Sequence, residues 1–455
     1  MNRHLSEFSA AMNGTLWGED VEFSGVSIDS RTCSHGDLFF AIRGERFDGH
    51  QYLSAAKDRG AVAAVVSSRQ DVEMPQICVG DTVVGLQKAA TAWRGNFAVP
   101  VIAVAGSNGK TTTKEMIASI LEQKSSCLST KGTLNNHLGV PLTLLGMAKT
   151  HWAAVIEVGA NHPGEVTELA KIVCPTVGVV TNAGAEHLEG FGTLEGAARA
   201  EGELFAALDK NSVAVMNADD EFIDLWKDMN CAERTLSFGL RESADIRPVG
   251  PIEISGVAGE SQAFSAITPC GIVNVGLSFA GSHNVRNALA ALAVGSLLGC
   301  SIKEMEAGLR DVQPVKGRLN IKSAASGGCI IDDSYNANPS SLETSLAVLS
   351  GVKGERWLAL GNMAELGSSS EKEHLSAGLL ARDAGVSRLF LVGEMAGMAA
   401  QTFGRGAEKF KSTDELIQRL EDKVADGVTL LVKGSRVNRL ERVVDALVTN
   451  QRAEV

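Results

Sequence analysis

Short, continuous runs of apolar residues recur along the chain and alternate with longer amphipathic stretches. The clearest run covers residues 99–105 and leads directly into the glycine-containing segment 106–113. The next residues predict a helix whose apolar face holds Met116, Ile117, Ile120 and Leu121. Continuous apolar strands of this kind are typical of parallel sheets covered on both faces, so the pattern predicts an α/β protein.

The pattern changes twice along the chain and predicts three domains. We expect a small α/β domain at 1–96, a central parallel-sheet domain at 97–313 and a Rossmann-like domain at 314–455. The predicted strands lie at residues 37–42, 61–66, 76–79, 99–105, 153–158, 176–181, 212–216, 328–331, 356–360, 388–392 and 428–432. The stretch 232–280 is less regular but rich in β-type residues, and a helix is predicted at about 284–298.

Composition narrows the class of protein. The 455 residues carry a net charge of −12 without a basic run, and only 5% are aromatic, which argues against a nucleic-acid surface. No apolar stretch approaches the ~20 residues of a membrane span, and residues 1–8 lack a signal-peptide core. Eight scattered cysteines match neither a zinc site nor a disulfide framework. We therefore expect a cytoplasmic protein with reduced, mostly buried thiols.

The segment 106–113 has the features of a phosphate-binding loop. Its glycines let backbone N–H groups turn toward an anion, the following helix adds its N-terminal dipole, and Lys110 can reach the β- and γ-phosphates. Val104 stands where the common motif has glycine, so this is a short form of the loop. The alternative is a glycine turn with an incidental lysine. The expected ATP- or GTP-contacting residues are Gly106, Asn108, Gly109, Lys110, Thr111 and Thr112.

Two further polar residues follow predicted strands of the central domain, where ligands of open α/β sheets bind. Glu157 ends the strand at 153–158 and can coordinate a magnesium ion together with the hydroxyl of Thr111. His187 follows the next strand and can hold a second magnesium ion. The alternative is a surface carboxylate and an ordinary loop histidine.

These motifs together resemble the Mur ligases, the ATP-dependent amide-forming enzymes of bacterial cell-wall synthesis. The resemblance covers nearly the whole chain and rests on segments 27–31, 36–40, 44–50, 106–113, 134–141, 281–287, 317–319 and 433–436. It implies that the first domain binds a UDP-sugar, with Ser30, Arg31 and Asp48 as expected substrate contacts. Asn135 and Asn136 belong to a segment that resembles a substrate-facing loop of the family.

The resemblance also implies nucleotide contacts from the later part of the chain. His283 would stack on adenine, and Asn287 would offer its amide to the edge of the base. Arg318 is similar to an arginine that domain closure brings onto the γ-phosphate, and Asp333 and Tyr335 resemble nucleotide-contacting residues. Taken singly, Arg318 or Tyr335 is as readily a solvated or core residue. The third domain would also bind substrate through Asn336, Asn338, Lys433 and Arg436.

Segments 332–341 and 360–367 resemble the branch of the family that adds D-alanyl-D-alanine to UDP-N-acetylmuramoyl-tripeptide. The resemblance implies ATP and Mg²⁺ as cofactors, an acyl-phosphate intermediate and a monomeric enzyme. Three alternatives remain open: the ligase that adds the third amino acid, a folylpolyglutamate synthetase-like ligase and a non-catalytic nucleotide-binding module. The sequence leaves open whether the third residue of the tripeptide is meso-diaminopimelate or lysine.

Two positions depart from the family pattern. Asn362 stands where this branch usually has aspartate, and Glu201 stands where the family has a carbamylated lysine that helps to hold the second magnesium ion. We expect Glu201 to be ionised at pH 7 and to supply that negative charge natively. Its side chain is shorter by about 3 to 4 Å, so we expect a water bridge or an electrostatic effect. The alternative is a solvated glutamate on a helix surface.

Overall fold

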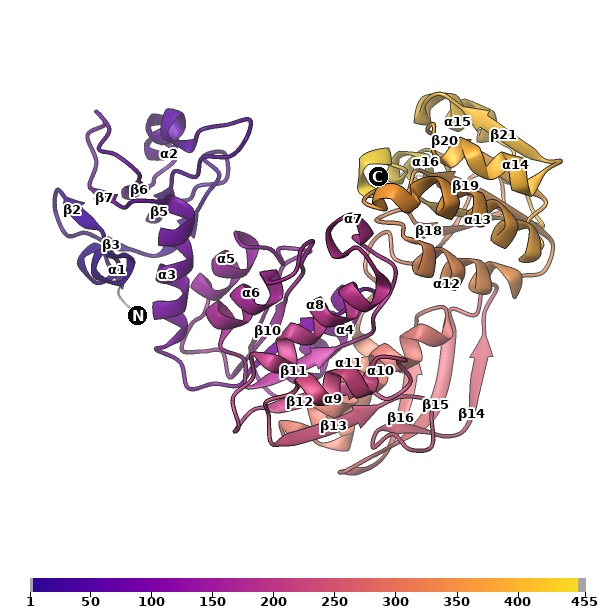
Figure 1. The fold of residues 1–455 in the computed structure, drawn as a ribbon, viewed down its shortest axis with the longest axis horizontal. Helices are drawn as coiled ribbons and strands as arrows, with labels where there is room; N and C mark the ends of the chain where they lie inside the picture. The colour runs from indigo at the N-terminus through magenta and orange to yellow at the C-terminus, as the bar shows by residue number, and fades with distance from the viewer. Residues whose placement is uncertain (1–2, 449–455) are drawn as a thin grey trace, which may run out of the picture.

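The computed structural model describes residues 3–448 and forms three units arranged side by side (Figure 1). The first unit is built on a five-stranded sheet of order β2-β7-β6-β5-β4, in which only β2 runs antiparallel to its neighbour, and a two-stranded ribbon of β1 and β3. Its elements are β1 (Arg3–His4), α1 (Leu5–Met12), β2 (Thr15–Trp17), β3 (Glu22–Phe23), β4 (Gly25–Ser27), β5 (Asp37–Phe40), η1 (Gly49–Tyr52), α2 (Leu53–Asp58), β6 (Ala63–Val66), β7 (Gln76–Cys78) and α3 (Thr82–Arg94).

The central unit contains a six-stranded parallel sheet of order β13-β12-β11-β8-β10-β9. Its strands and covering helices are β8 (Val101–Ala105), α4 (Lys110–Glu122), β9 (Cys127–Ser129), α5 (Gly139–Leu145), β10 (Ala153–Glu157), α6 (Glu165–Val173), β11 (Val177–Val180), α7 (Leu188–Phe191), α8 (Leu194–Ala206), β12 (Val213–Asn217), α9 (Ile223–Met229) and β13 (Arg234–Phe238). Separate apolar clusters pack on its two faces, with α5, α6 and α8 on one and α4 on the other.

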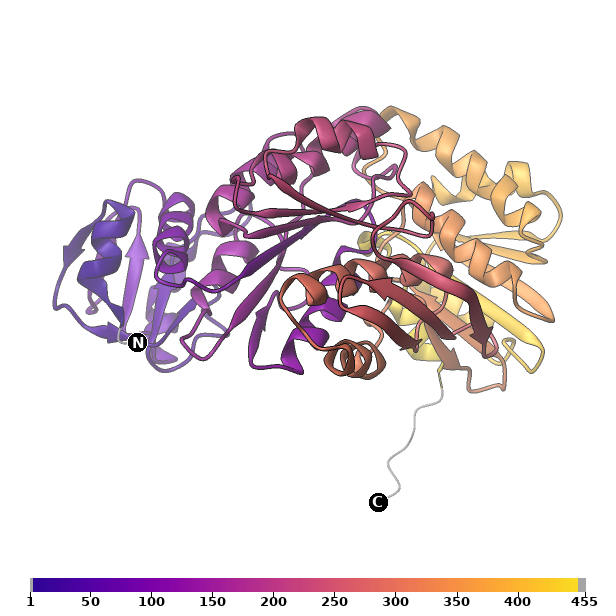
Figure 2. The ribbon, with the colours of Figure 1, turned by 90° about the horizontal axis from the view of Figure 1, so that it is seen from below.

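An antiparallel sheet and two helices complete the central unit. They are β14 (Arg247–Ser255), β15 (Ser261–Thr268), β16 (Gly271–Leu277), α10 (Ser282–Leu297) and α11 (Ile302–Asp311). Helices α10 and α11 pack against α4 and join the same apolar cluster. Figure 2 shows the β14–β16 sheet beside the third unit, where Ala258 of the β14–β15 turn enters that unit's core.

The third unit is a six-stranded sheet of order β17-β18-β22-β19-β20-β21, parallel except for β17. Its elements are β17 (Asn320–Ser323), β18 (Cys329–Asp333), α12 (Pro339–Ser350), β19 (Glu355–Gly361), η2 (Gly367–Ser369), α13 (Ser370–Asp383), β20 (Arg388–Val392), η3 (Ala396–Met398), α14 (Ala399–Phe403), β21 (Ala407–Phe410), α15 (Thr413–Leu420), β22 (Val428–Lys433), η4 (Arg436–Asn438) and α16 (Glu441–Leu447). Helices α12 and α13 cover one face, and α15 and α16 cover the other.

The three-unit α/β architecture is as predicted, with corrections in detail. The predicted irregular stretch 232–280 begins with β13, which is part of the parallel sheet. The short strands β9, β17 and β21 were not predicted, because three or four residues carry too little periodicity to be distinguished from loops. We propose domain boundaries at 96/97 and 313/314, since no sheet takes strands from two of these ranges.

Other composition-based expectations have mixed outcomes. The prediction of mostly buried thiols is wrong, because only Cys33 and Cys300 are buried, whereas Cys174, Cys231 and Cys270 are exposed. Between residues 3 and 448, no helix is long and apolar enough to cross a membrane.

A buried arginine links the first and central units. Arg94, the last residue of α3, donates hydrogen bonds to the carbonyl oxygens of Phe97 (2.6 Å), Val173 (3.0 Å) and Cys174 (3.1 Å). Helix α3 also packs on α5 and α6, and one apolar cluster runs through both units. The first unit is therefore attached through a continuous core rather than by a linker alone.

Candidate functional site

A cavity of about 820 Å³ lies where the central and third units meet. It is lined by the loop before α4, by residues beyond the ends of β10 and β11, by the start of α10 and by residues 333–345 of the third unit. Ligands of open α/β sheets bind at the carboxyl ends of the strands, so the cavity occupies the expected place.

The phosphate-binding loop has the backbone that a glycine sequence permits. Gly106 and Gly109 have φ angles of 123° and 82°, in the region that favours glycine. A Cβ at Gly109 would lie 2.6 Å from Oδ1 of Asn287, so α10 packs directly against the loop. Helix α4 begins at Lys110, and its N-terminal N–H groups and dipole therefore lie beside the loop.

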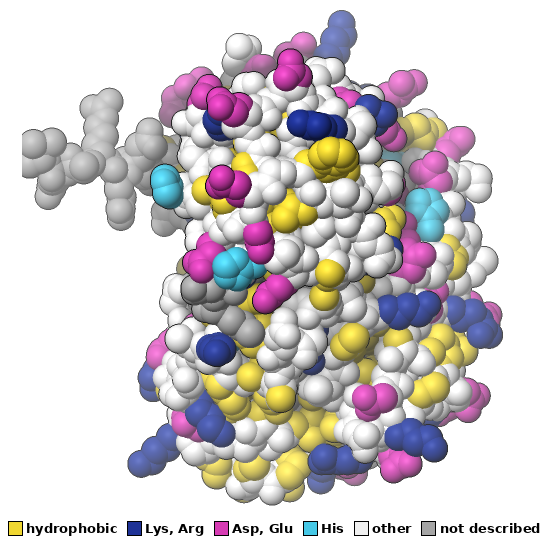
Figure 3. Space-filling model, turned by 90° about the vertical axis from the view of Figure 1, so that its left-hand side faces the viewer, with side chains coloured by type: hydrophobic (Ala, Val, Ile, Leu, Met, Phe, Trp, Pro, Cys, Tyr) yellow, Lys and Arg dark blue, Asp and Glu magenta, His cyan; other side chains and the backbone are white. Residues whose placement is uncertain are grey.

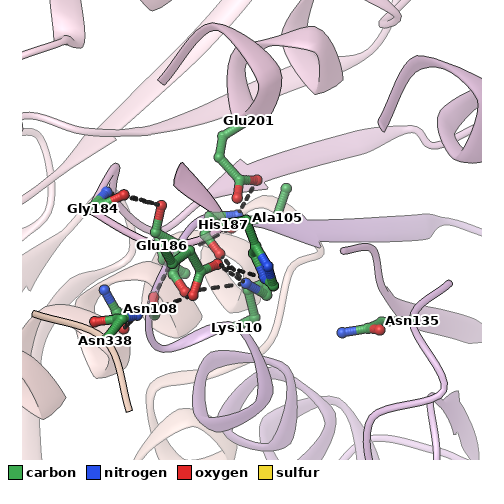
Figure 4. Close-up of polar contacts among 12 residues, drawn as sticks. Ala105, Asn108, Lys110, Asn135, Gly184, Glu186, His187, Glu201 and Asn338 are labelled. Carbon is green, nitrogen blue, oxygen red and sulfur yellow. Dashed lines mark hydrogen bonds and ion pairs between the residues drawn. The ribbon is translucent and has the colours of Figure 1, made fainter. Parts of the chain in front are cut away.

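Lys110 is held by backbone carbonyls and by a carboxylate. Its Nζ donates to the carbonyl oxygen of Ser107 (3.1 Å) and forms an ion pair with Oε1 of Glu186 at 3.0 Å (Figure 4). Desolvation opposes the charge of this lysine, but Glu186 and Glu201 outweigh it and raise the pKa of Lys110. The loop therefore carries a fixed positive charge.

Two buried oxygen atoms beside Lys110 lack hydrogen-bond partners among the described residues, namely Oγ1 of Thr111 and Oε2 of Glu157. The other Glu157 oxygen, Oε1, accepts from Nδ2 of Asn135 at 2.8 Å. Hydroxyl and carboxylate oxygens suit Mg²⁺, which takes one or two protein ligands and completes its shell with water and phosphate. Within residues 3–448 no cluster of three acidic, histidine or cysteine side chains offers a metal site, so this pair fits magnesium rather than a metal with an all-protein ligand shell.

His187 precedes α7 and has a φ of 50°, which is unusual for a residue with a side chain. Its Nδ1 is in contact with the carboxylate of Glu365 from the third unit, and its Nε2 lies 4.0 Å from Oε1 of Glu186. Desolvation lowers the pKa of His187, but these two carboxylates outweigh it and raise the pKa. A carboxylate on Nδ1 fixes the ring and leaves Nε2 available, as in metal-bound histidines.

Glu201 lies behind the loop on α8 and is fully buried. Its Oε2 accepts a hydrogen bond from the backbone N–H of Gly106 at 2.7 Å (Figure 4), and it does not line the cavity. Burial raises the pKa of Glu201 to about 7, although Lys110 opposes the rise. The raised pKa means that Glu201 is only partly ionised at pH 7 rather than fully so. The alternative of a solvated helix-surface residue is wrong, because the side chain is buried.

The predicted adenine contacts lie at the start of α10, and both line the cavity. Nδ1 of His283 is buried without a hydrogen-bond partner among the described residues, and burial lowers the pKa of His283 to about 4. The ring is therefore neutral, which suits stacking. Asn287 donates from Nδ2 to Oδ1 of Asn284 at 2.9 Å. Arg286 is fixed by Asp219, with Nε 2.9 Å from Oδ2.

The third unit contributes a cation stacked on an aromatic ring. The guanidinium of Arg318 lies 4.4 Å from the ring centre of Tyr335, whose hydroxyl donates to Oγ1 of Thr133 at 2.7 Å. Arg436 also approaches the Tyr335 ring, at 5.7 Å, but it does not line the cavity. The phenol thus positions Arg318 and connects it to the central unit.

Asp333 and Lys433 form a buried ion pair at the ends of β18 and β22, and both line the cavity. Asp333 also accepts from the hydroxyl of Ser345 (2.6 Å), and Lys433 donates to the carbonyl oxygen of Asn336 (3.2 Å). Desolvation lowers the pKa of Lys433 despite the nearby Asp333. Asn338 donates from Nδ2 to Oε2 of Glu186 and to Oδ1 of Asn108, both at 3.1 Å.

Three predicted substrate contacts of the first unit lie outside this cavity. Arg31 is exposed and makes a bidentate pair with Asp29, and Asp48 holds Arg43 and His50. No side-chain hydrogen bond is present at Ser30 in the described part of the chain. The cavity therefore brings together the predicted residues of the central and third units but not those of the first.

Several predicted positions serve the loop or its surroundings. Asn135 and Asn136 line the cavity beside Glu157. Gly106 does not line it, and its backbone N–H points away from the cavity to donate to Glu201. Asn362 does not line the cavity, because its Oδ1 accepts from the N–H of Ala396 at 2.8 Å and its carbonyl accepts from Asn438 at 2.7 Å. The side-chain amide of Asn362 thus binds the backbone of the segment after β20 and holds it beside the end of β19.

Sequence reasoning missed Glu186 and Glu365. Glu186 could have been found, since it precedes His187 in the same loop after β11. Glu365 carries no local signal, because it lies in the third unit and contacts His187 only in the folded chain.

Comparison with known proteins gives a consistent family assignment. The chain matches the Mur ligase family, catalytic domain, over residues 22–114, the Mur ligase middle domain over 104–295 and the Mur ligase, glutamate ligase domain over 317–436. The UDP-N-acetylmuramoyl-tripeptide--D-alanyl-D-alanine ligases of Escherichia coli K12 and Bacillus subtilis 168 are 39% and 31% identical to it. These alignments cover 98% of this chain and 98% and 99% of the relatives.

Solved structures agree with this assignment. A crystal structure of MurF from Acinetobacter baumannii has 34% sequence identity and a TM-score of 0.89, and the match covers 98% of each chain. The crystal structure of MurF ligase from Thermotoga maritima in complex with ADP has 29% identity and a TM-score of 0.80, over 93% of this chain and 96% of that one.

The burial of Glu201 predicts a particular pH dependence of stability. Its pKa is about 7 in the folded chain and 4.5 as an ordinary glutamate, so between these values the folded state holds a proton that the unfolded chain has released. Stability therefore falls as the pH rises through this window, by about 3 kcal/mol for this group. Urea denaturation of the protein without nucleotide or magnesium should show this fall, and Glu201→Gln should remove it.

Glu195 provides the matched control for this measurement. It lies on the same helix but is exposed and paired with Arg199, so Glu195→Gln should keep the parental pH dependence. A Glu201→Gln curve parallel to that of the parent would contradict the assignment of this titration to Glu201.

Proposed function

The chain belongs to the Mur ligase family, and from this premise we propose that it joins D-alanyl-D-alanine to UDP-N-acetylmuramoyl-tripeptide in peptidoglycan precursor synthesis, using ATP. The observation that carries the proposal is the full-length similarity to ligases of this name, which includes the third unit. The alternatives of a third-amino-acid-adding ligase, a folylpolyglutamate synthetase-like ligase and a non-catalytic module are separated by the substrate test below.

The reaction must convert an unreactive carboxylate into one with a leaving group. We propose that ATP phosphorylates the terminal carboxylate of the tripeptide and that the amine of D-alanyl-D-alanine then attacks the acyl phosphate. The resulting adduct collapses with release of phosphate. Lys110 is positioned to bind the phosphates, because it is charged and fixed at the start of α4.

Arg318 supplies the second positive charge from the third unit. Its stacking on Tyr335 and the hydrogen bond from Tyr335 to Thr133 keep it at the junction of the two units. We infer that it stabilises negative charge on the transferred phosphoryl group. The contacts of Asn338 with Glu186 and Asn108 link the two units at the same junction.

We propose that Thr111 and Glu157 hold one magnesium ion and that His187 contributes to a second. The ions would neutralise phosphate charge during transfer. Asn135 orients the Glu157 carboxylate, and Glu365 orients the His187 ring, so each ligand is fixed by a neighbour.

We propose that the first unit binds the UDP-sugar through Ser30, Arg31 and Asp48, with Asn135 and Asn136 facing the peptide. His283 and Asn287 would take the adenine, and Asp333 and Tyr335 would contact the nucleotide. Asn336, Asn338, Lys433 and Arg436 would lie near the incoming amine. We propose a monomeric enzyme, as the family resemblance implies. We also propose that it is cytoplasmic, since the reaction consumes ATP.

Phosphate release tests the proposed function directly. With ATP and magnesium, release should require both UDP-N-acetylmuramoyl-tripeptide and D-alanyl-D-alanine, because the first supplies the carboxylate that is phosphorylated and the second supplies the amine that displaces the phosphate. Reactions that lack one substrate serve as controls, and so does the pair of a folate acceptor with glutamate. Equal turnover with the folate pair would refute the assignment, and the two forms of the tripeptide would show which third residue is preferred.

Substitutions of Lys110 and Arg318 should affect ATP binding and turnover differently. Lys110→Ala removes the fixed charge of the phosphate-binding loop, so turnover should fall by at least about 10³-fold with the fold intact. Arg318→Ala should leave most ATP binding but lower the rate by about 10²-fold or more, because its charge acts on the transferring group. Single-turnover phosphate release at saturating ATP measures both. An unchanged rate in Arg318→Ala would rule out its part in phosphoryl transfer.

We infer that Glu201 acts on the loop through Gly106 and through its charge toward Lys110. Activity should therefore not depend on bicarbonate, since no lysine at this position needs carbamylation. Glu201→Gln keeps an oxygen that can accept from Gly106 but removes the charge, whereas Glu201→Ala removes both. Turnover in carbon-dioxide-depleted buffer should decrease from the parent to Gln and again to Ala. Parental turnover in Glu201→Gln, or strong stimulation of the parent by bicarbonate, would end this interpretation.

A further inference from the structure

A second cavity, of about 460 Å³, lies between the first and central units. It is bounded by β1, β3 and α3 of the first unit, by loop residues that include Val62, and by residues 147–149, which follow α5. None of its lining residues lines the larger cavity, so the two are separate places in the fold. Its volume lies within the range of about 300 to 1,000 Å³ that is typical of small-molecule sites.

Arg3 lines this cavity and is only 8% exposed. The centre of its guanidinium lies 4.2 Å from the ring of Trp93 and 5.9 Å from that of Phe23. No hydrogen bond or ion pair links this guanidinium to any residue of 3–448. Burial lowers the pKa of Arg3. Its guanidinium nitrogens are not among the fully buried atoms that lack a partner, which is consistent with their facing the cavity.

Arg94 provides an internal comparison, because it is equally buried and lies one residue after Trp93. Its guanidinium donates to three backbone carbonyls, as described above. Arg3 is held instead by aromatic stacking, which leaves the N–H donors at the edge of the guanidinium plane without acceptors among residues 3–448. These donors are therefore available to a ligand in the cavity.

The charge around the cavity favours an anion. Lys149 and His35 line its exposed mouth, together with one acidic residue, Glu22, which lies 3.4 Å from Nε2 of His4. The lining also includes the partly exposed apolar residue Val62, whereas Met147 has no exposed surface. Figure 3 views the molecule from the end formed by the first unit, where basic, acidic and hydrophobic side chains are mixed.

We propose that this cavity is a second binding site, for a small molecule that carries a carboxylate or phosphate on an apolar body. The anionic group would accept hydrogen bonds from Arg3, with Lys149 adding charge at the mouth, and the apolar part would lie against Val62. The site shares no residue with the larger cavity and none with the proposed UDP-sugar contacts Ser30, Arg31 and Asp48.

Isothermal titration calorimetry with phenyl phosphate and with benzoate tests the site and separates the two anionic groups. The titrations use the full chain with saturating ATP and magnesium, so that the phosphate-binding loop is filled. We expect at least one probe to bind with one site per chain, and benzyl alcohol, which lacks the charge, not to bind. Absence of binding by both anions at millimolar concentration would overturn the proposal.

Variants locate the bound anion. Arg3→Met keeps an apolar side chain against Trp93 but removes the donors, so affinity should fall at least about tenfold. Lys149→Glu, at the exposed mouth, should also weaken binding and decides the matter if Arg3→Met does not fold. Lys372→Met removes an equivalent charge from exposed α13 and should bind as the parent does. Parental affinity in folded Arg3→Met, or weakened binding in Lys372→Met, would overturn the assignment.

Discussion

The partly buried ammonium group of Lys110 is the charge on which the arrangement of the site depends. It is compensated on one side by Glu186 and influenced on the other by Glu201, whose carboxylate binds the N–H of Gly106. A charged lysine at this depth is stable only while these carboxylates stay close. The same requirement fixes the loop, because Lys110 also donates to the loop's own carbonyls.

This electrostatic centre also connects the two units that form the cavity. Glu186 accepts from Asn338 of the third unit, His187 contacts Glu365, and Tyr335 donates to Thr133. Few apolar contacts are involved in these links, whereas the first unit shares a continuous apolar core with the central one. The third unit is therefore held at the site mainly by polar contacts, which can exchange when substrates bind, and this fits a ligase that closes around them.

Much of the site could be predicted because its residues belong to short segments with a local reason for their position. Gly106 and Gly109 are needed for the backbone of the loop, and Glu157 ends a strand, so its place at the sheet edge follows from the pattern. Glu201 was identified by position alone. Its burial, and with it the raised pKa, depends on how α8 packs behind the loop and could not be derived from the helix sequence.

The sequence by itself determined the strand and helix order, the phosphate-binding loop and the family, because periodicity and glycine chemistry act over a few residues. The tertiary structure decided which charges meet. Lys110 and Glu186 are 76 residues apart in the sequence, and Arg3 stacks on Trp93 only when the first unit folds onto α3. The electrostatic energy of two charges depends on the distance between them and on how deeply they are buried, and a short stretch of sequence determines neither. For that reason the pairing of Glu365 with His187 and the stacking of Arg3 on Trp93 and Phe23 emerged only from the folded chain.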